Sequence, residues 1–224
     1  MIQKLKDETA LLALFYDSDH FCEQIRAPFT SDGYVCATET HRLILIKPEI
    51  CKGEYKPNKL HVQKTLTPHN IDITLTLARL KKAVERVSKE KEMKTIRPAI
   101  ECKDCEGEGE VEWSYEDKDG YTHEEYHTCP ICNGTGNSSL AIEEPTGRMI
   151  PAATASIGIY ENIFNAYNIL ALCDAMEMLG IDKCKYVASS KVGGNSFSLT
   201  DEITVVICPC IADDPAVWVN RKRE

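Results

Sequence analysis

The chain has 224 residues, a formal net charge of −9 and a hydrophobic content of 43%. This length is sufficient for one or two domains with a buried core. It contains no run of about 18 apolar residues and no secretion signal at the N-terminus, so we expect a cytoplasmic protein without membrane contact.

The first part of the chain predicts a short helix followed by strands. Apolar residues within 1–18 favour an amphipathic helix. A turn at 31–33 separates two β-like runs, and the second leads into a further run at Arg42–Ile46. Residues 48–70 are rich in Pro, Lys and His and predict loops around a short strand.

A longer helix is predicted over 76–94. Its buried face is indicated by apolar residues spaced three and four apart: Leu77, Leu80, Val84 and Val87. The opposite face gathers a stripe of cations: Arg79, Lys82, Arg86 and Lys89. One interpretation of this stripe is a solvated charged face, and the other is a surface that faces DNA phosphates.

Two copies of Cys-x-x-Cys-x-Gly-x-Gly lie 27 residues apart. Their cysteines are Cys102, Cys105, Cys129 and Cys132. Zinc prefers four tetrahedral donors, and thiolates are its usual structural ligands. The glycines allow a tight backbone that points N–H groups toward the sulfurs. The sequence therefore predicts one structural zinc ion in a closed site, which leaves no open position for chemistry.

Between the two motifs the chain predicts a β-hairpin, with strands at 110–116 and 121–128 around a turn at 117–120. From 101 to 136 there are eleven acidic residues and two lysines, a balance of −9, so this segment repels phosphate. Four aromatic residues are candidates for binding a protein partner: Trp113, Tyr115, Tyr121 and Tyr126. His123 and His127 are expected to be surface residues, because four cysteines already complete a zinc shell.

The last part of the chain predicts the order strand, helix, strand, strand. Asn165 is a candidate N-cap, and Gly180 is expected to end the helix. Its buried face is predicted from Ile169, Leu172, Cys173, Met176 and Leu179. The two strands after it are expected near 185–189 and 195–199.

A final buried strand is predicted over 203–211, where Cys208 and Cys210 point to one face. Their spacing allows a metal-binding interpretation, but the apolar surroundings favour packing in the core. The seven cysteines outside the zinc motifs are expected to be reduced and mostly buried. Residues 215–224 are expected to be a tail whose end, 220–224, is frayed.

The repeated cysteine motif is similar to the cysteine-rich domain of the DnaJ-type co-chaperones. That domain carries four repeats and two zinc ions, whereas this chain has two repeats, enough for one ion. The His-Pro-Asp triplet of those co-chaperones is absent. The likeness covers about 35 residues and implies a zinc geometry, not a co-chaperone function.

Three separate segments resemble bacterial DNA polymerase sliding clamps. Thr38-Glu-Thr-His-Arg-Leu43 resembles the Thr-Asp-Gly-His-Arg-Leu turn of a clamp, with Glu-Thr in place of Asp-Gly. Phe164-Asn-Ala-Tyr-Asn-Ile-Leu170 is similar to the Phe-Asn-x-x-Tyr-Leu start of a clamp helix. Cys208-Pro-Cys-Ile211 stands where a clamp ends in Met-Pro-Met-Arg-Leu, with cysteines in place of methionines. The three occur in the order that a clamp would place them.

The resemblance implies an α+β fold in which DNA-clamp-like helices pack on an antiparallel sheet, with an inserted zinc-ribbon β-hairpin. The expected body has a first part at 1–98 and a second part at 140–214. The four-cysteine zinc hairpin is expected at 99–139, and the tail at 215–224. A clamp subunit has three domains, and this chain has length for about one plus the insertion. A ring would therefore need several copies, a homo-oligomer, and the alternative is that no ring forms.

The function implied is that of a non-enzymatic, clamp-related protein that associates with duplex DNA through backbone contacts, without reading sequence. The alternative is a protein-interaction adaptor whose acidic zinc hairpin docks a partner, with no DNA binding. An enzyme is not expected, because the sequence has no phosphate loop, nucleophile elbow or His-Glu-x-x-His pattern.

Overall fold

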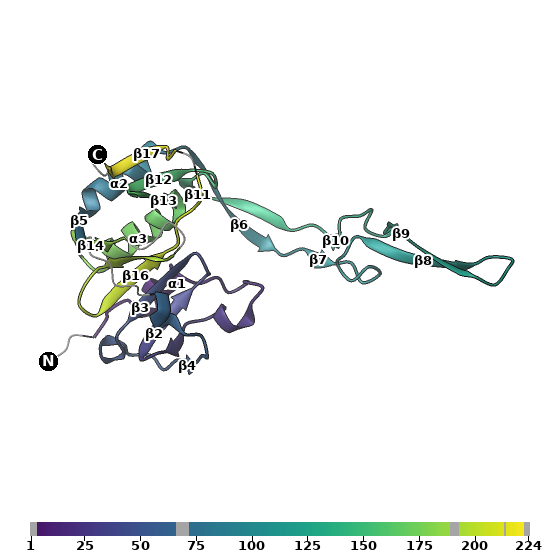
Figure 1. The fold of residues 1–224 in the computed structure, drawn as a ribbon, viewed down its shortest axis with the longest axis horizontal. Coiled ribbons are helices and arrows are strands. Elements are labelled where there is room, and N and C mark those ends of the chain that lie inside the picture. The colour runs from purple at the N-terminus through teal and green to yellow at the C-terminus, as the bar shows by residue number, and fades with distance from the viewer. Residues whose placement is uncertain (1–3, 66–71, 189–192, 213, 222–224) are drawn as a thin grey trace. The chain divides into compact units, whose positions relative to one another are not determined.

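The structure is a computed structural model, and it describes residues 4–65, 72–188, 193–212 and 214–221 (Figure 1). The chain divides into two compact units: unit 1 is Met1–Glu90 with Pro151–Glu224, and unit 2 is Lys91–Ile150. Strands dominate both units, and helices occur in unit 1, so the predicted α+β class with an inserted hairpin is confirmed. Within these described ranges, no helix is both long enough and apolar enough to span a membrane.

The N-terminal half of unit 1 is a helix followed by strands. Its elements are α1 (Glu8–Ala13), β1 (Phe29–Ser31), β2 (Tyr34–Thr38), β3 (Arg42–Ile46), β4 (Lys56–Pro57), β5 (Asp72–Thr76) and α2 (Leu77–Arg86). Single 3-10 turns lie at Glu23–Ile25, Pro48–Ile50 and Val62–Thr65. The helix predicted over 1–18 is shorter and covers Glu8–Ala13. It closes with tighter i to i−3 hydrogen bonds, from the Leu14 N–H to Leu11 O at 3.3 Å and from the Phe15 N–H to Leu12 O at 3.0 Å.

The helix predicted over 76–94 is also shorter than expected. It is capped by the Thr76 side chain and ends at Arg86, with Leu80 and Val84 on its buried face. From Lys89 the chain continues as strand β6 (Lys89–Arg97). Beyond Val87 the positions that would continue the helix's buried face carry charged residues, so a longer helix would have nothing apolar to bury there.

The C-terminal half of unit 1 contains β12 (Ser156–Tyr160), β13 (Asn162–Asn165), α3 (Ala166–Met178), β14 (Lys183–Val187), β15 (Asn195–Ser198), β16 (Ile203–Ile207) and β17 (Val217–Arg221). The Asn165 side chain accepts the Tyr167 N–H at 2.8 Å, which confirms the predicted N-cap. Gly180, at φ +66°, ends α3: its N–H bonds to Glu177, and the Ile181 N–H bonds to Met176. This is a Schellman ending, as the sequence predicts.

Two predictions about the C-terminus are wrong. The strand expected over 203–211 ends at Ile207, and Cys208 and Cys210 are exposed instead of packed in the core. The Cys208 N–H still donates to the carbonyl of His41, which follows the β3/β16 register beyond Arg42 and Ile207. The Cys210 N–H instead donates to the carbonyl of Ile163 in β13, so the chain leaves the large sheet between these two cysteines; both bonds are 2.8 Å. Asn220 and Arg221 of the end expected to be frayed belong to β17, which pairs in parallel with β12, and 222–224 lie outside the described residues.

Among the described residues, unit 1 has an eight-stranded sheet and a three-stranded sheet. The larger sheet has the order β4-β1-β2-β3-β16-β15-β14-β5. Two three-stranded meanders, one N-terminal and one C-terminal, meet in it through the antiparallel pair β3 and β16, with Ile44 opposite Val205. Each meander follows a helix, α1 or α3, so the two halves repeat one arrangement. The smaller sheet has the order β13-β12-β17.

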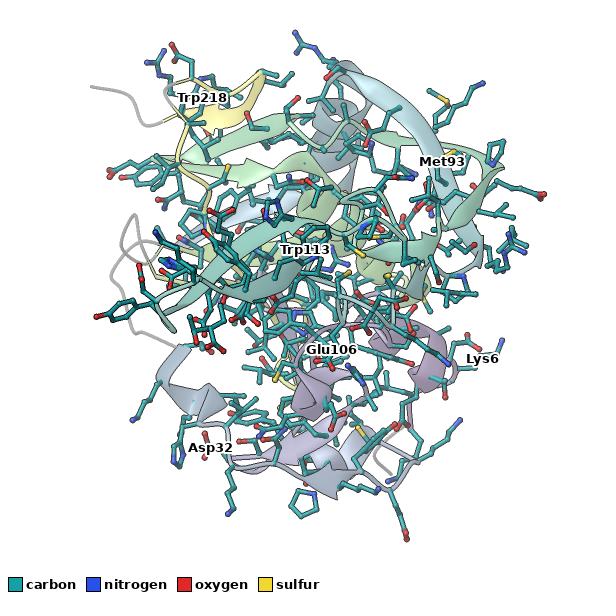
Figure 2. All side chains as sticks on the ribbon, turned by 90° about the vertical axis from the view of Figure 1, so that its right-hand side faces the viewer. Lys6, Asp32, Met93, Glu106, Trp113 and Trp218 are labelled. Carbon is teal, nitrogen blue, oxygen red and sulfur yellow. The ribbon has the colours of Figure 1, made fainter. Side chains whose placement is uncertain are left out.

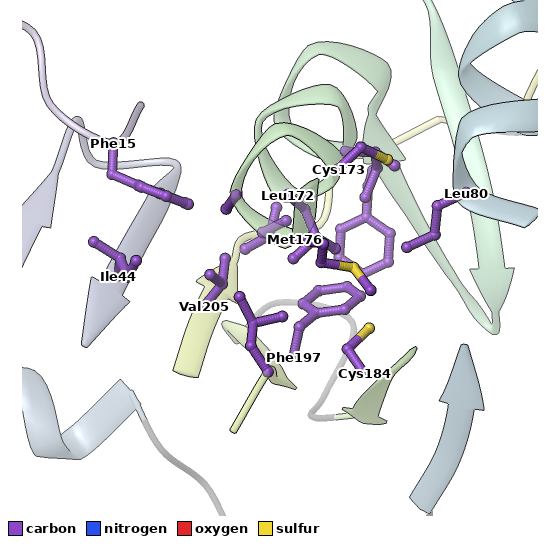
Figure 3. Close-up of a cluster of buried hydrophobic side chains, with 14 of the residues drawn as sticks. Phe15, Ile44, Leu80, Leu172, Cys173, Met176, Cys184, Phe197 and Val205 are labelled. Carbon is purple, nitrogen blue, oxygen red and sulfur yellow. The ribbon is translucent and has the colours of Figure 1, made fainter. Parts of the chain in front are cut away.

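The main core lies between the eight-stranded sheet and the helices (Figure 3). Strand alternation divides β3 between two faces: Ile44 and Ile46 join the main core, whereas Leu43 and Leu45 join a smaller cluster on the other face. Figure 3 shows Phe15 near Ile44, and it shows Phe197 beside Met176 of α3.

A buried carboxylate ties α1 to the loop that follows β3. Glu8 is only 6% exposed and accepts hydrogen bonds from the Lys52 N–H at 2.5 Å, the Gly53 N–H at 3.1 Å and the Tyr55 hydroxyl. Burial works to raise the pKa of Glu8, but these hydrogen bonds together hold it below its ordinary value of 4.5.

Replacing Glu8 with Gln is expected to lower the free energy of unfolding by about 1–3 kcal/mol at pH 7, because the amide accepts fewer hydrogen bonds and leaves donors unpaired. A lowered pKa stabilises the fold above the ordinary carboxyl value, and this contribution is lost as the pH falls through the pKa of the folded state. Urea unfolding at pH 7 and pH 4 should therefore show a smaller difference between variant and parent at the lower pH. The exposed Glu49→Gln is the control, and an equal effect there would contradict the role of Glu8.

Candidate metal centre and nucleic-acid interface

Unit 2 is a chain of two-stranded ribbons. Its elements are the greater part of β6, β7 (Ile100–Glu101), β8 (Glu110–Glu116), β9 (Thr122–Thr128), β10 (Asn137–Ser139) and β11 (Ile142–Pro151). β6 pairs with β11, β7 with β10, and β8 with β9 (Figure 1). The four motif cysteines lie between the β7/β10 pair and the β8/β9 hairpin. The predicted hairpin and its turn at 117–120 are confirmed.

The four cysteines form one buried cluster that could hold a metal ion. Their sulfurs all lie within 4.8 Å of one another, and each cysteine is at most 6% exposed. Cys102 Sγ is 3.9 Å from Cys129 Sγ, and Cys105 Sγ is 3.7 Å from Cys132 Sγ. Four thiolates at the zinc–sulfur distance of about 2.3 Å would be about 3.8 Å apart in a tetrahedron, so the sulfurs fit a tetrahedral metal such as zinc.

Backbone N–H groups point at two of the sulfurs, whose pKa values move in opposite directions. The Gly109 N–H donates to Cys105 Sγ at 3.3 Å, but burial and the neighbouring thiols still raise the pKa of Cys105 to about 11. Burial opposes ionisation of Cys132, but the N–H groups of Gly136 and Gly134 and the neighbouring thiols lower the pKa of this thiol to about 7. Neither His123 nor His127 belongs to the cluster, as predicted.

The two glycine-rich turns interlock through a reciprocal pair of hydrogen bonds. The Cys102 N–H donates to Gly136 O at 2.9 Å, and the Cys129 N–H donates to Gly109 O at 2.8 Å. Gly109 and Gly136 have positive φ angles, and a Cβ on either would lie within 3.0 Å of a carbonyl oxygen of the opposite turn. The second glycine of each motif is thus required by the approach of the other motif.

We expect Gly109→Ala and Gly136→Ala each to weaken zinc binding at least about tenfold, because the methyl group separates the two turns and strains the backbone. Competition with a chromophoric chelator measures the affinity, with Cys105→Ser as the reference for a broken site. Gly120→Ala is the matched control, since Gly120 also has a positive φ but meets no backbone atom within 4 Å. An equal loss in Gly120→Ala would mean that backbone strain alone, not the approach of the turns, is responsible.

The register of the hairpin sorts its aromatic residues onto two faces. Trp113 and Tyr115 lie on one face, opposite Glu125 and His123, and we call this the aromatic face (Figure 2 labels Trp113). Its members are Val111, Trp113, Tyr115, His123, Glu125 and His127. Tyr126 belongs to the other face with Glu112 opposite it, and Tyr121 lies in the turn. The predicted partner residues are all exposed but do not form one patch. Strand alternation in the sequence could have shown this.

The predicted cationic stripe is exposed. Arg79, Lys82 and Arg86 lie on the solvent side of α2, together with Glu85, whereas Lys89 lies on β6 and not on the helix. Within the part of the chain that the structure describes, none of the four cations of the stripe forms an ion pair. The neighbouring Lys81 does pair, with Glu177 of α3 at 2.6 Å, and fixes α2 against α3.

The three segments that resemble sliding clamps meet in unit 1. Besides the bonds from Cys208 to His41 and from Cys210 to Ile163, the Arg42 guanidinium donates to Asn168 Oδ1 at 2.9 Å. It lies 5.0 Å from the Tyr167 ring and donates to Leu14 O at 2.9 Å. We call this meeting point the junction, defined by Thr38–Leu43, Phe164–Leu170 and Cys208–Ile211.

Thr40 stands where the clamp turn has glycine, and its backbone has the conformation that glycine favours. Its φ is +84°, a strained value for a β-branched residue. The Glu39 carboxylate supports the turn by accepting the N–H groups of His41 at 3.2 Å and Arg42 at 3.0 Å. The sequence analysis did not predict this strain. The replacement of glycine by Thr40 in the clamp-like turn could have indicated it, because glycine often marks a positive φ.

Thr40→Gly is expected to raise the free energy of unfolding by about 0.5–1.5 kcal/mol, because relief of the positive φ outweighs the added freedom of the unfolded chain. Denaturant unfolding of unit 1 measures the change. Thr200→Gly, at an exposed turn position, is the control and should lower stability. A loss of stability in Thr40→Gly would contradict the strain at this position.

Among known proteins, the chain is similar to solved structures only. No protein-family model and no curated protein matches the chain. A Helicobacter pylori beta clamp bound to a DNA ligase peptide is 12% identical with a TM-score of 0.49, over 94% of this chain and 65% of that one. The DNA polymerase III subunit beta of Pseudomonas aeruginosa is 9% identical with a TM-score of 0.44, over 89% and 62%.

A Streptococcus pneumoniae DNA polymerase III beta chain is 12% identical with a TM-score of 0.42, over 92% of this chain and 62% of that one. The chain thus spans less than two thirds of the length of each of these three clamps.

Proposed function

We propose that the protein is a non-enzymatic, clamp-related DNA-associated protein that carries one structural zinc ion. The junction is the observation that carries this proposal. Three clamp-like segments far apart in the sequence come together. A main-chain hydrogen bond joins Cys208 to His41, and the Arg42 guanidinium joins the first segment to Asn168 of the second. Thr40 has the positive φ that glycine would favour at its position. Chance matches of sequence would have no reason to meet in the fold.

Zinc is the metal that suits the buried four-cysteine cluster. The ligands are four thiolates at tetrahedral separations, and zinc favours this set in structural sites. A shell of four protein sulfurs has no position for water or substrate, which supports a structural role and a protein without catalysis.

In this proposal the stripe Arg79, Lys82, Arg86 and Lys89 contacts the phosphate backbone of duplex DNA without reading base sequence. The absence of ion pairs at these cations among the described residues leaves their charge available to phosphate. Unit 2 carries the acidic 101–136 segment, which repels phosphate and stays off the DNA. Several copies would be required to surround a duplex, since one chain spans less than two thirds of a matched clamp.

The DNA contact is tested by changing all four stripe residues to Gln and measuring duplex binding by fluorescence anisotropy from about 25 to about 200 mM salt. If each cation neutralises one phosphate, the slope of log affinity against log salt should become shallower by roughly 3–4. The matched control changes four exposed lysines elsewhere, Lys6, Lys56, Lys59 and Lys64, and should keep the slope.

Equal losses in the two quadruple variants would show a general effect of net charge and would contradict the stripe as the DNA contact. Light scattering of the zinc-loaded protein with and without duplex DNA gives the number of copies, and a monomer indifferent to DNA would contradict the clamp-related function.

A second candidate is a protein-interaction adaptor. The observation that favours it is the exposed hairpin of unit 2, which combines a strongly acidic surface with Trp113 and Tyr115, each 58% exposed. Aromatic residues of this kind serve as anchors at protein interfaces. In this function the zinc ion holds the hairpin in shape, and DNA is not required.

A further inference from the structure

The aromatic face of the hairpin contains the same three-residue arrangement twice. In the first, the Tyr115 ring stacks on His123 with centroids 5.0 Å apart, and His123 Nε2 lies 2.9 Å from the Asp117 carboxylate. In the second, the Trp113 and His127 rings are also 5.0 Å apart, and His127 Nε2 lies 3.3 Å from Glu125. Each imidazole is thus placed between an aromatic ring and an acid.

This arrangement holds two aromatic rings in defined orientations while leaving much of each exposed. Both Trp113 and Tyr115 are 58% exposed. Each contacts its imidazole across the strand pair, so their positions are fixed before any partner arrives, and little side-chain entropy remains to be lost on binding.

The charge around the aromatic face determines which sign of charge a partner can have. Residues 101–136 carry eleven acidic side chains against two lysines, and neither lysine belongs to the aromatic face. Phosphate and acidic partners are repelled, and cations are attracted. Guanidinium groups both stack on indole and phenol rings and bind carboxylates through paired hydrogen bonds, whereas an ammonium group is a strongly hydrated point charge. The pairing of ring and carboxylate favours arginine over lysine.

The spacing selects the partner's conformation. Trp113 and Tyr115 are two residues apart on one strand, which separates them by about 6.8 Å. An extended segment presents every second side chain on one side at the same interval. We propose that the aromatic face binds an extended segment of a partner protein that carries arginines at alternate positions. This inference rests on the adaptor function and is independent of DNA binding.

The experiment uses the full zinc-loaded chain and a synthetic fluorescent peptide of alternating Arg and Ser, with Lys-Ser and Glu-Ser peptides of equal length beside it. The chain has two tryptophans, so a Trp218→Phe background makes Trp113 the only tryptophan, whose emission is followed with excitation that spares the tyrosines. We expect the Arg-Ser peptide to change Trp113 emission and to bind at least about fivefold more tightly than the Lys-Ser peptide.

A pair of double variants locates the surface by peptide anisotropy. Trp113→Ser with Tyr115→Ser removes both rings of the aromatic face, and affinity for the Arg-Ser peptide should fall about tenfold. Tyr121→Ser with Tyr126→Ser removes two equally exposed rings outside that face and should leave affinity within about twofold. One bound zinc ion per chain confirms that each variant keeps unit 2 folded.

Three results would overturn the proposal: equal affinity for the Arg-Ser and Lys-Ser peptides, equal losses in the two double variants, or no binding of any peptide. The first would leave an adaptor that selects partners by charge alone, and the third would remove the adaptor function as well. Duplex binding measured on the same variants should be unchanged, so failure here is distinguishable from failure of the DNA contact.

Discussion

The fold of unit 1 depends on the antiparallel pairing of β3 with β16. These strands are separated by more than 150 residues, and their contact joins the N-terminal meander to the C-terminal one. It also brings α1 and α3 over a shared core, because Ile44 and Val205 lie opposite each other beneath them. The junction follows from the same pairing. Arg42 begins β3 opposite Ile207, and only this register brings its guanidinium to Asn168 and the chain after β16 to His41.

Unit 2 is stabilised differently from unit 1, because it lacks a sheet with a buried face. Two-stranded ribbons are marginal in water because they have no buried face, and nearly all residues of β6, β8, β9 and β11 are exposed. The described buried core of this unit is the cysteine cluster, with Val111 packed beside it. A metal ion held by these four cysteines would take the place of a hydrophobic core, and reciprocal hydrogen bonds already join the two glycine-rich turns around the cluster.

Much of this structure could be predicted from short, local patterns in the sequence. Paired motifs predict a metal cluster because ligand spacing is a local property, and Asn165 and Gly180 mark the ends of α3 for the same reason. The sequence patterns did not show which strands, far apart in the chain, pair with each other. The charged run after Val87 has the pattern of a helix, but β6 forms there because β11 is available as a partner strand. Cys210 has the pattern of a core residue, but its N–H bonds to Ile163 of β13, so the chain has left the large sheet there. Strand alternation alone could have predicted which hairpin residues share a face. The residue opposite Trp113 is known only once the register of the two strands is known.

The place where the chain leaves and re-enters unit 1 has a consequence for how the protein could have been assembled. The Ala152 N–H bonds to Ser88 O at 2.9 Å, so the two ends of the intervening segment are neighbours. A short turn could join them and leave the path of the body unchanged. The insertion can therefore lengthen, shorten or be exchanged over generations without a change in the surrounding sheet. The body and the segment that carries the four cysteines are free to evolve under separate selection.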